Sequence, residues 1–254
     1  RRGSAELVKD EVVSEGQISL RINGRDYMVI SMTPLEIEEF AVGHLMAEGI
    51  IERLDEISDL RINNGKIDVQ LRAEKPLRAA WFVSSGCGSG GRKIPPIAWM
   101  KPKRRGFTIK FTSEAIIEAA GSLNLSAETY RRTGGTHSAA LHDERGRALI
   151  ISEDIGRHTA VDKVIGKAAL KGLDLSRALL ASSGRLSSDI VLKAVNAGVP
   201  VVVSLSAPTD MGVKLAEAAG LTLIGFARGR RFNVYAHPER IILPEGSGGS
   251  GLSI

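Results

Sequence analysis

Cysteine is nearly absent from this sequence, since Cys87 is the only one among 254 residues. A single cysteine excludes an intrachain disulfide and any cysteine-rich zinc site. Cysteine use this sparse is typical of a reducing compartment, so we expect a cytoplasmic protein. Long apolar runs are missing as well: no stretch approaches the roughly 18 residues of a membrane-spanning helix, and no secretory signal opens the sequence. We therefore expect no membrane span.

Aromatic residues make up only 4% of the chain, which leaves little material for the stacking platforms that bind single-stranded nucleic acid. The formal net charge is nevertheless +5 and the pI is near 9.4, which indicates an anionic partner. The cations gather in two short clusters, residues 101–105 and 228–231. Short clusters favour a small polyanionic ligand over a long duplex, so we expect no nucleic acid partner. A solvated charged face is the alternative for the first cluster.

The segment around the cysteine has a composition that exposes it. Residues 83–93 contain four glycines and three serines, which bury a side chain poorly, and Arg92 and Lys93 follow closely. Nearby cations lower the pKa of a thiol and favour the nucleophilic thiolate. The sequence thus predicts a reachable and activated Cys87, with an idle surface thiol as the alternative.

The first part of the chain reads as a small α+β domain, which we place at residues 5–106. Alternating segments on both sides of Asn23-Gly24 and of Asn64-Gly65 predict two β-hairpins. Between them, Thr33 and Pro34 predict the N-terminal cap of a helix over residues 35–48. His44 in this helix is expected to pack or to face solvent rather than to bind a ligand.

The pattern changes near residue 107, and residues 107–245 predict a three-layer α/β domain, followed by a flexible tail at 246–254. A helix from residue 112, a hairpin turning at residues 143–146 and a helix ending near residue 170 come first. Apolar strands then alternate with helices, in the order 178–181, 188–197, 199–205, 211–219 and 221–226. This alternation is typical of a parallel sheet.

Ligands of open α/β sheets bind beyond the carboxyl ends of the strands. Three polar segments fall there, at residues 182–188, 204–210 and 228–231. The first two lead into helix N-termini, whose unpaired N–H groups attract anions, and the third supplies guanidinium groups suited to phosphate. The sequence therefore predicts a phosphate or nucleotide site at this edge.

Two further motifs are dense in polar groups. His137 follows a Gly-Gly turn, and His158 follows Glu153, Asp154 and Arg157. A purely structural interpretation, in which Asp154 caps a helix and Arg157 pairs with Glu153, leaves both histidines unexplained. We interpret the histidines as groups that orient a ligand or move protons near neutral pH.

On these motifs the chain resembles the formate dehydrogenase accessory sulfurtransferase family (FdhD). The matching blocks follow the order of the family and span nearly the whole chain: 33–36, 85–88, 133–137, 153–158 with 162–163, 182–185, and 224–226 through 234–240. Several long motifs in order are far more specific than a single glycine pattern.

The resemblance implies a sulfur carrier. Members of the family take sulfur from a cysteine desulfurase as a cysteine persulfide. They pass it to a molybdenum (or tungsten) cofactor that bears two pterin guanine dinucleotides and that formate dehydrogenase needs in its sulfurated form. By this resemblance Cys87 carries the persulfide as the catalytic residue of a sulfurtransferase, GDP mimics part of the cofactor, the C-terminal half has a cytidine-deaminase-like fold, and the protein is a homodimer.

The resemblance and the edge argument together predict the residues that bind this molybdopterin guanine dinucleotide cofactor. They are Phe226, Ala227, Arg228, Gly229, Arg230 and Arg231 in one segment, Ser183, Gly184 and Arg185 in a second, and His137, Asp154, Arg157 and His158. The chain departs from the family at Gly90, where a second cysteine of a Cys-x-x-Cys motif is common. Sulfur handling in this chain therefore relies on one thiol.

Three other functions compete. A zinc deaminase needs His-x-Glu and Pro-Cys-x-x-Cys ligands, and the sequence has neither. A nucleic-acid binder would bind duplexes with a steep salt dependence. A non-catalytic chaperone that only binds and delivers the guanine dinucleotide cofactor would use the same basic crevice, while Cys87 would be dispensable. This last alternative stays open.

Overall fold

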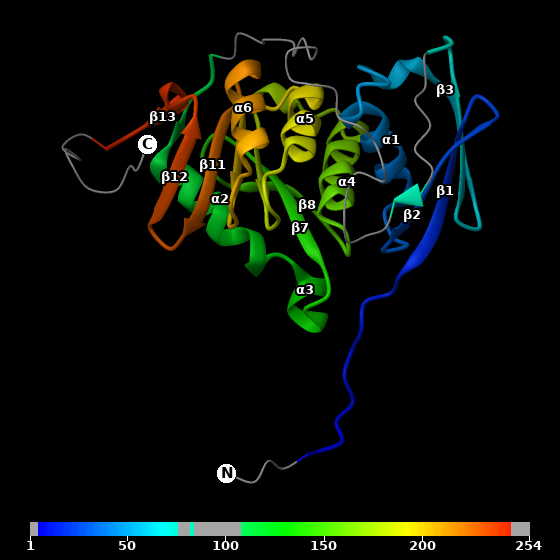
Figure 1. Cartoon of the computed structure of the whole chain (residues 1–254), viewed down its shortest axis with the longest axis horizontal. Helices are drawn as coiled ribbons and strands as arrows, with labels where there is room; N and C mark the ends of the chain where they lie inside the picture. The colour runs from blue at the N-terminus through cyan, green and yellow to red at the C-terminus, as the bar shows by residue number, and fades with distance from the viewer. Residues whose placement is uncertain (1–4, 76–81, 84–107, 245–254) are drawn as a thin grey trace.

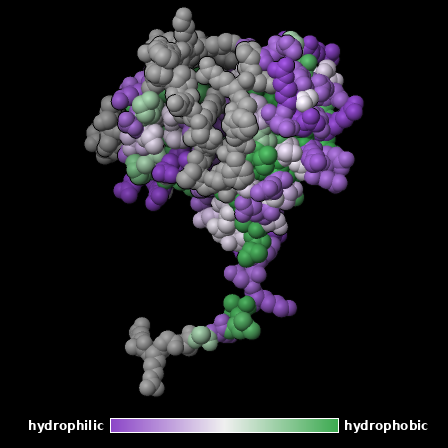
Figure 2. Space-filling view, turned by 45° about the vertical axis from the view of Figure 1, so that its right-hand side comes forward, coloured by the Kyte–Doolittle hydropathy of each residue, from purple (hydrophilic) through white to green (hydrophobic). Residues whose placement is uncertain are grey.

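The computed structural model describes residues 5–75, 82–83 and 108–244, and it has a mixed α/β architecture with two main sheets and helices between and outside them (Figure 1). The predicted α/β class is confirmed, whereas the cytidine-deaminase-like layout stays a prediction. Residues 5–15 form no helix or strand. Glu11 pairs with Arg132, and the described residues before it extend away from the body (Figures 1 and 2), with Leu7 fully exposed. Within the described residues, no helix is both long and apolar enough to cross a membrane.

The N-terminal sheet has five strands in the order β3-β4-β1-β2-β5. Their bounds are Gly16–Ile22 (β1), Arg25–Met32 (β2), Ile57–Asn63 (β3), Lys66–Leu71 (β4) and Phe82–Val83 (β5). Both predicted hairpins are confirmed, because Asn23 and Gly24, like Asn64 and Gly65, take the positive φ values that a two-residue turn of this hand requires. The sequence did not predict the parallel pairing of β1 with β4 that joins the two hairpins.

Helix α1 (Ile37–Ala47) covers this sheet and buries Phe40 and Leu45 against its strands. The prediction that Thr33 caps this helix is wrong. The helix begins later, after Glu36, which has a φ of 53° and makes no capping hydrogen bond. The hydroxyl of Thr33 instead accepts a hydrogen bond from the N–H of Ile155 at 3.3 Å, 122 residues away in the sequence.

The C-terminal sheet has six strands in the order β12-β11-β10-β9-β7-β8. Their bounds are His137–His142 (β7), Ala148–Asp154 (β8), Leu179–Ser182 (β9), Val201–Ser204 (β10), Thr222–Arg228 (β11) and Arg231–Ala236 (β12). The three predicted apolar strands, β9 to β11, are parallel as expected. The sheet as a whole is mixed, because the hairpin β7–β8 and the unpredicted strand β12 run antiparallel to their neighbours.

Helices cover both faces of this sheet and make three layers, as the sequence predicts. Helix α2 (Ser113–Leu125) covers one face, and α4 (Arg157–Leu170), α5 (Ser188–Ala197) and α6 (Asp210–Ala219) cover the other. Alternate residues of one strand serve the two cores: Val201 and Val203 pack on the side of α2, and Val202 packs on the side of α4 to α6. The smaller elements are β6 (Phe111–Thr112), α3 (Glu128–Thr133) and β13 (Ile241–Ile242), with 3-10 turns at Leu54–Glu56, Leu175–Arg177 and Pro238–Arg240.

The two halves of the chain meet where α1 packs on α4. A Cβ on Gly43 would lie 1.7 Å from the carbonyl oxygen of Asp162, and one on Gly166 would lie 1.9 Å from the carbonyl oxygen of Glu39. The helices are therefore in backbone contact, which only glycine at both positions permits. We call this contact, with the buried charges around it, the helix junction.

Two buried charge networks lie at the helix junction. The ammonium of Lys163 lies 2.6 Å from the carboxylate of Asp154, with both side chains 0% exposed, and it also donates to the carbonyl of Thr33. The carboxylate of Asp162 shares a hydrogen bond with His44 and accepts two from Lys193. Burial opposes the charge on Asp162, but Lys193 and His44 hold its pKa below the usual range. His44 is thus a packed, hydrogen-bonded residue, as expected.

Candidate functional site

The candidate site lies at one edge of the C-terminal sheet, where β9, β10 and β11 end. Because β7 runs antiparallel to β9, His137 at the start of β7 lies at this same edge, beside the end of β8 at Asp154. The turn between β11 and β12 also lies here, at the lower end of the sheet in Figure 1. We call it the carboxyl edge. It brings together every described segment that the sequence predicts for the site.

His137 and Ser183 are in direct contact at this edge. The Nδ1 atom of His137 lies 3.1 Å from the hydroxyl oxygen of Ser183, and the N–H of Ser138 donates to the same oxygen at 3.0 Å. Two residues 46 positions apart in the sequence thus form one polar unit, as the prediction of a shared site requires.

Gly184 is shaped by its neighbour Arg157. A Cβ on Gly184 would lie 2.7 and 2.8 Å from the Cδ and Cβ atoms of Arg157, so the arginine stem packs directly over this glycine. The hydroxyl of Ser204 donates to the carbonyl of Gly184 at 2.7 Å and ties the ends of β9 and β10 together. Arg185, the next residue, is exposed.

Both histidines of the carboxyl edge are held neutral. Burial, followed by the charges of Lys193 and Arg157, lowers the pKa of His158 to about 3. Burial and the charge of Arg157 also lower the pKa of His137. Because the pKa of His158 is far below 7, this residue is suited to orient a ligand as a neutral imidazole rather than to exchange protons near neutral pH.

The Nε2 atom of His158 is buried and makes no hydrogen bond to any described residue. Its Nε2 atom is 3.9 Å from the carboxylate of Asp189, which is too long for a hydrogen bond. Neither this nitrogen nor the hydroxyl of Ser187, the N-cap residue of α5, has a hydrogen-bond partner within the described part of the chain. Ser187 lies in the segment 182–188 that the sequence predicts at this edge, whereas Asp189, in the first turn of the helix that follows, was not predicted.

Asp154 is buried beneath the carboxyl edge and holds the loop after β8 in place. Its carboxylate accepts hydrogen bonds from the N–H groups of Thr33 and Gly156 and from Lys163. The interpretation that Asp154 caps α4 is wrong, because the N-cap is Gly156. With 0% of its side chain exposed, Asp154 holds the loop that presents Arg157 and His158, and a direct contact between Asp154 and the cofactor stays a prediction.

Glu153, which the purely structural interpretation pairs with Arg157, is bonded to the start of helix α3. Its carboxylate accepts hydrogen bonds from the N–H groups of Thr129 and Tyr130 and from the hydroxyl of Thr136. These bonds fix the segment that leads into His137.

The predicted segment 226–231 covers the end of β11, the turn after it and the first residue of β12. Phe226 has a φ of 52°, a left-handed conformation that is rare for an aromatic residue, and 43% of it is exposed. Its N–H donates to the carbonyl of Ser206, and the Nε of Arg228 donates to the carbonyl of Leu205 at 3.1 Å. The segment is therefore tied to the end of β10, and Arg228, Arg230 and Arg231 are exposed.

A cavity of about 330 Å³ opens beside this segment, and we call it the α2 cavity. Four of the predicted residues line it: Ala227, Arg228, Gly229 and Arg231. The sequence did not predict its other wall, which consists of Ile117, Ala120, Gly121 and Asn124 of α2 together with Leu205. The i, i+3, i+4, i+7 spacing of the α2 residues, which places them on one helix face, was the signal that was available.

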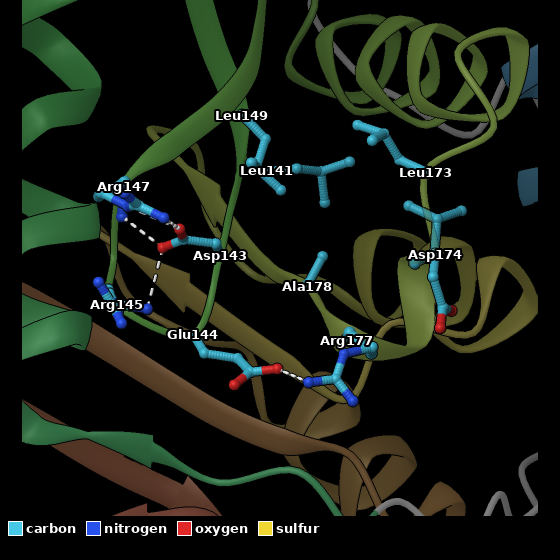
Figure 3. A pocket seen from close by; sticks show the side chains of 11 residues that line it. Leu141, Asp143, Glu144, Arg145, Arg147, Leu149, Leu173, Asp174, Arg177 and Ala178 are labelled. Atoms are coloured by element: carbon cyan, nitrogen blue, oxygen red, sulfur yellow. Dashed lines mark hydrogen bonds and ion pairs between the residues drawn. The ribbon is translucent and has the colours of Figure 1, made fainter.

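A second cavity, of about 470 Å³, lies at the opposite edge of the sheet (Figure 3). Four of its charged side chains form two pairs: Arg147 bonds Asp143, and Arg177 bonds Glu144. Leu141, Leu149 and Leu173 form its apolar lining. It contains none of the predicted site residues.

Two predicted features, Cys87 and the basic cluster 101–105, lie outside the described residues. Among the residues that the structure does describe, no group of three or more His, Cys, Asp or Glu side chains is placed to hold a metal ion.

Comparison with known proteins gives a consistent result. The model of the FdhD/NarQ family matches residues 13–242. A sulfur carrier protein FdhD from Methanothermobacter thermautotrophicus is 37% identical over 92% of this chain and 93% of its own length, and one from Bacillus subtilis is 35% identical over 94% of each. A solved structure from Desulfotalea psychrophila, described as that of a formate dehydrogenase accessory protein, has a TM-score of 0.77 and 27% identity over 95% of each chain.

Proposed function

Because the chain belongs to the FdhD/NarQ family, we propose that it is a sulfur carrier that serves a formate dehydrogenase. In this proposal it is a sulfurtransferase that accepts sulfur from a cysteine desulfurase as a persulfide on Cys87. It passes the sulfur to a molybdenum or tungsten cofactor with two pterin guanine dinucleotides. Relatives that carry the name sulfur carrier protein FdhD, at 35–37% identity over nearly the whole chain, support this assignment.

Sulfur acceptance is a thiolate reaction. The Cys87 thiolate attacks the outer sulfur of the desulfurase persulfide, the S–S bond there breaks, and its electron pair leaves with the desulfurase thiolate. Cys87 then carries the persulfide. Release of this sulfur at the sulfide level regenerates the Cys87 thiolate and consumes two electrons, which the metal centre of the client or an added thiol supplies. Arg92 and Lys93 favour the thiolate in both steps.

The second part of the proposal is that the protein binds the cofactor that receives the sulfur. The observation that supports it is that the predicted site segments lie together at the carboxyl edge. Segments around residues 137, 157, 183 and 228, which are far apart in the sequence, meet at one edge of one sheet. The arginines of segment 226–231 are suited to phosphate oxygens, and the neutral imidazoles of His137 and His158 are suited to hydrogen-bond an uncharged part of the cofactor. The proposed partners are thus the desulfurase, the dehydrogenase and a second copy of the chain.

The test is mass spectrometry of the protein after incubation with a cysteine desulfurase and free cysteine. We expect a gain of one sulfur atom on Cys87, which dithiothreitol removes, and no gain on a Cys87→Ala variant. Ser89→Ala, in the same segment, is the matched control and should gain sulfur like the wild type.

Activation of formate dehydrogenase gives the second readout. The Cys87→Ala variant should fail to activate the enzyme in cells that lack the native carrier. A Cys87→Ala variant that activates fully would refute sulfur transfer and would support the non-catalytic chaperone instead.

A further inference from the structure

The second cavity, at the edge of the sheet opposite the carboxyl edge, takes no part in the proposed function (Figure 3). Leu141, Leu149 and Leu173 line it, and Leu149 is 46% exposed. Its volume of about 470 Å³ lies within the range of ligand pockets. We call it the leucine cavity. Removing apolar surface from water is favourable, so this lining favours an apolar occupant.

Two charges at the rim of the leucine cavity are available to an occupant. The other four charged side chains there bond each other in two pairs. Arg145 and Asp174 make no ion pair with any described residue, and they lie on opposite sides of the leucines in Figure 3. Asp174 accepts hydrogen bonds from Ser176 through one carboxylate oxygen, which leaves its other oxygen for a cation. A fitting occupant therefore has an apolar centre, an anionic group on one side and a cationic group on the other.

The N-terminal segment of the chain has this pattern. We call residues 5–10 the arm, and its central sequence is Glu6, Leu7, Val8 and Lys9. Every residue of the arm is exposed, with Leu7 at 100% and Val8 at 69%, and Figure 2 shows apolar side chains on it that stand clear of the body. Segments that stay free in solution are typically poor in aliphatic residues. Two adjacent aliphatic side chains on such a segment therefore indicate a docking sequence.

The arm leaves the body at the carboxyl edge, far from the leucine cavity of its own chain. Glu11 bonds Arg132 at 3.1 Å, and a Cβ on Gly135 would lie 2.7 Å from the Cγ1 atom of Val13. From there the arm extends away from the body, below the sheet in Figure 1. Six extended residues reach about 20 Å. The arm of one copy is thus directed toward a second copy rather than back to the opposite edge of its own sheet.

We propose that the arm of one copy docks in the leucine cavity of a second copy, and that two-fold symmetry makes the exchange reciprocal. The aliphatic pair of the arm packs on the leucines. Glu6 then faces Arg145, and Lys9 faces Asp174 at the other side. The inference rests on the proposed function only in that a second copy is a proposed partner. The family model begins at residue 13, so the arm lies outside the part of the chain that it matches.

The first test changes the arm. Analytical ultracentrifugation of the full chain gives the dissociation constant of the dimer for the wild type, Leu7→Asp and Leu125→Asp. Leu125 is 73% exposed at the end of α2, so it is the matched control. We expect Leu7→Asp to raise the dissociation constant at least about tenfold, because it places a carboxylate in an apolar cavity, and Leu125→Asp to dimerise like the wild type. Equal dissociation constants of Leu7→Asp and the wild type, or a monomeric wild type, would overturn the proposal.

The second test changes the cavity. Leu149→Arg places a charge in the apolar lining, and Ile62→Arg, on the edge strand β3 of the other sheet and 39% exposed, is the matched control. We expect only Leu149→Arg to raise the dissociation constant of the dimer at least about tenfold. Thermal unfolding of both variants checks that the fold is intact. A folded Leu149→Arg that dimerises like the wild type would show that the leucine cavity is not the docking site.

Exchanging two charges tests the orientation of the arm on exposed residues that the fold does not need. Glu6→Arg and Arg145→Glu should each raise the dissociation constant of the dimer about threefold at low salt, since each places like charges opposite one another. The double variant should return toward the wild-type value, because the charges are opposite again. Additive losses in the double variant would contradict the contact between Glu6 and Arg145 and, with it, the proposed orientation.

Mixing the two variants shows whether the arm docks on a second copy or on its own chain. Leu7→Asp keeps an intact cavity, and Leu149→Arg keeps an intact arm. A heterodimer of the two therefore has one intact contact, whereas a homodimer of either has none. We expect the mixture to dimerise more tightly than either variant alone. An arm that docks on its own chain would give no recovery on mixing, and that result would overturn the exchange.

The failures of the two proposals are distinguishable. Leu7→Asp should gain sulfur on Cys87 like the wild type, because the arm has no part in the thiolate reaction. A wild-type dimer that neither Leu7→Asp nor Leu149→Arg weakens would leave the homodimer in place and overturn the arm exchange. Failure of Cys87 to gain sulfur would refute the carrier and leave the arm exchange unaffected.

Discussion

The helix junction and the carboxyl edge both border α4, but they differ in how their buried polar groups are bonded. Toward the helix junction, the charges of Asp154 and Lys163, and of Asp162 and Lys193, are buried and directly bonded to each other. Toward the carboxyl edge, the buried Nε2 of His158 and hydroxyl of Ser187 have no hydrogen-bond partner among the described residues. Buried polar groups are normally satisfied, and a ligand bound at the edge would supply partners for these two. The buried charges of the junction are satisfied within the chain, whereas ligand binding at the edge is what we propose.

The largest expected effect concerns the buried pair of the helix junction. Lys163→Met leaves the carboxylate of Asp154 buried without its counter-ion, and it should lower the free energy of unfolding by about 3–5 kcal/mol. Urea unfolding followed by circular dichroism measures this loss. Lys171→Met, on an exposed lysine just after the same helix, is the control and should change the stability by less than about 0.5 kcal/mol. If the two variants were equally stable, the buried pair of the helix junction would not contribute to the stability of the fold.

A smaller loss is expected where α1 touches α4. Gly43→Ala places a Cβ against the carbonyl oxygen of Asp162, so the two helices must separate, at a cost of about 1–3 kcal/mol. The matched variant is Gly121→Ala, also a helical glycine, whose Cβ meets no atom. Opposite signs of the two stability changes are expected in the same urea experiment. A stabilised Gly43→Ala would show that the helices are not in backbone contact.

The third effect is a pH dependence from the carboxyl edge, which is small just below pH 6.5 and grows as the pH falls. The pKa of His158 is about 3 in the folded protein and near the ordinary 6.5 when unfolded, so the unfolded state binds the extra proton between these values. The free energy of unfolding should therefore be fully retained above pH 6.5 and should fall by about 1.4 kcal/mol per pH unit below it.

His158→Gln removes this titration and isolates it from the other histidines. His137 and the buried His142 also have lowered pKa values, the latter about 4, so the variant should keep part of the slope. The measurement compares urea unfolding of both proteins between pH 7 and pH 5. Equal slopes would show that His158 is not held neutral by the fold.

Much of the fold follows from local signals. Asn-Gly turns fix the N-terminal hairpins, and short apolar strands between helices fix β9 to β11 and their helices. Thr33 shows where local reasoning fails. Thr-Pro before a helical pattern reads as a cap, but apart from the N–H of Leu35 the partners of Thr33 are Asp154, Ile155 and Lys163. These contacts span more than 120 residues, and a local stretch of sequence gives no sign of them.

Some residues of the candidate site could likewise be predicted from local sequence, and others could not. Ser183 and Arg228 are predictable because parallel strands end at a common edge, whereas His137 reaches this edge as the first residue of the antiparallel strand β7. Gly121 and Asn124 were not predicted, because a helix covers that edge only once the whole sheet has formed. The buried state of Asp154 could not be foreseen either, since it depends on Lys163 and on Thr33 from the other half of the chain.

The paired glycines of α1 and α4 also have a bearing on protein engineering. Chimaeras that exchange one half of this chain for that of a relative will inherit a helix-to-helix spacing set by Gly43 on one side and Gly166 on the other. A donor half with any bulkier residue at its position would push the halves apart. A chimaera should therefore fold only when both parent sequences have glycine at the positions where α1 and α4 touch.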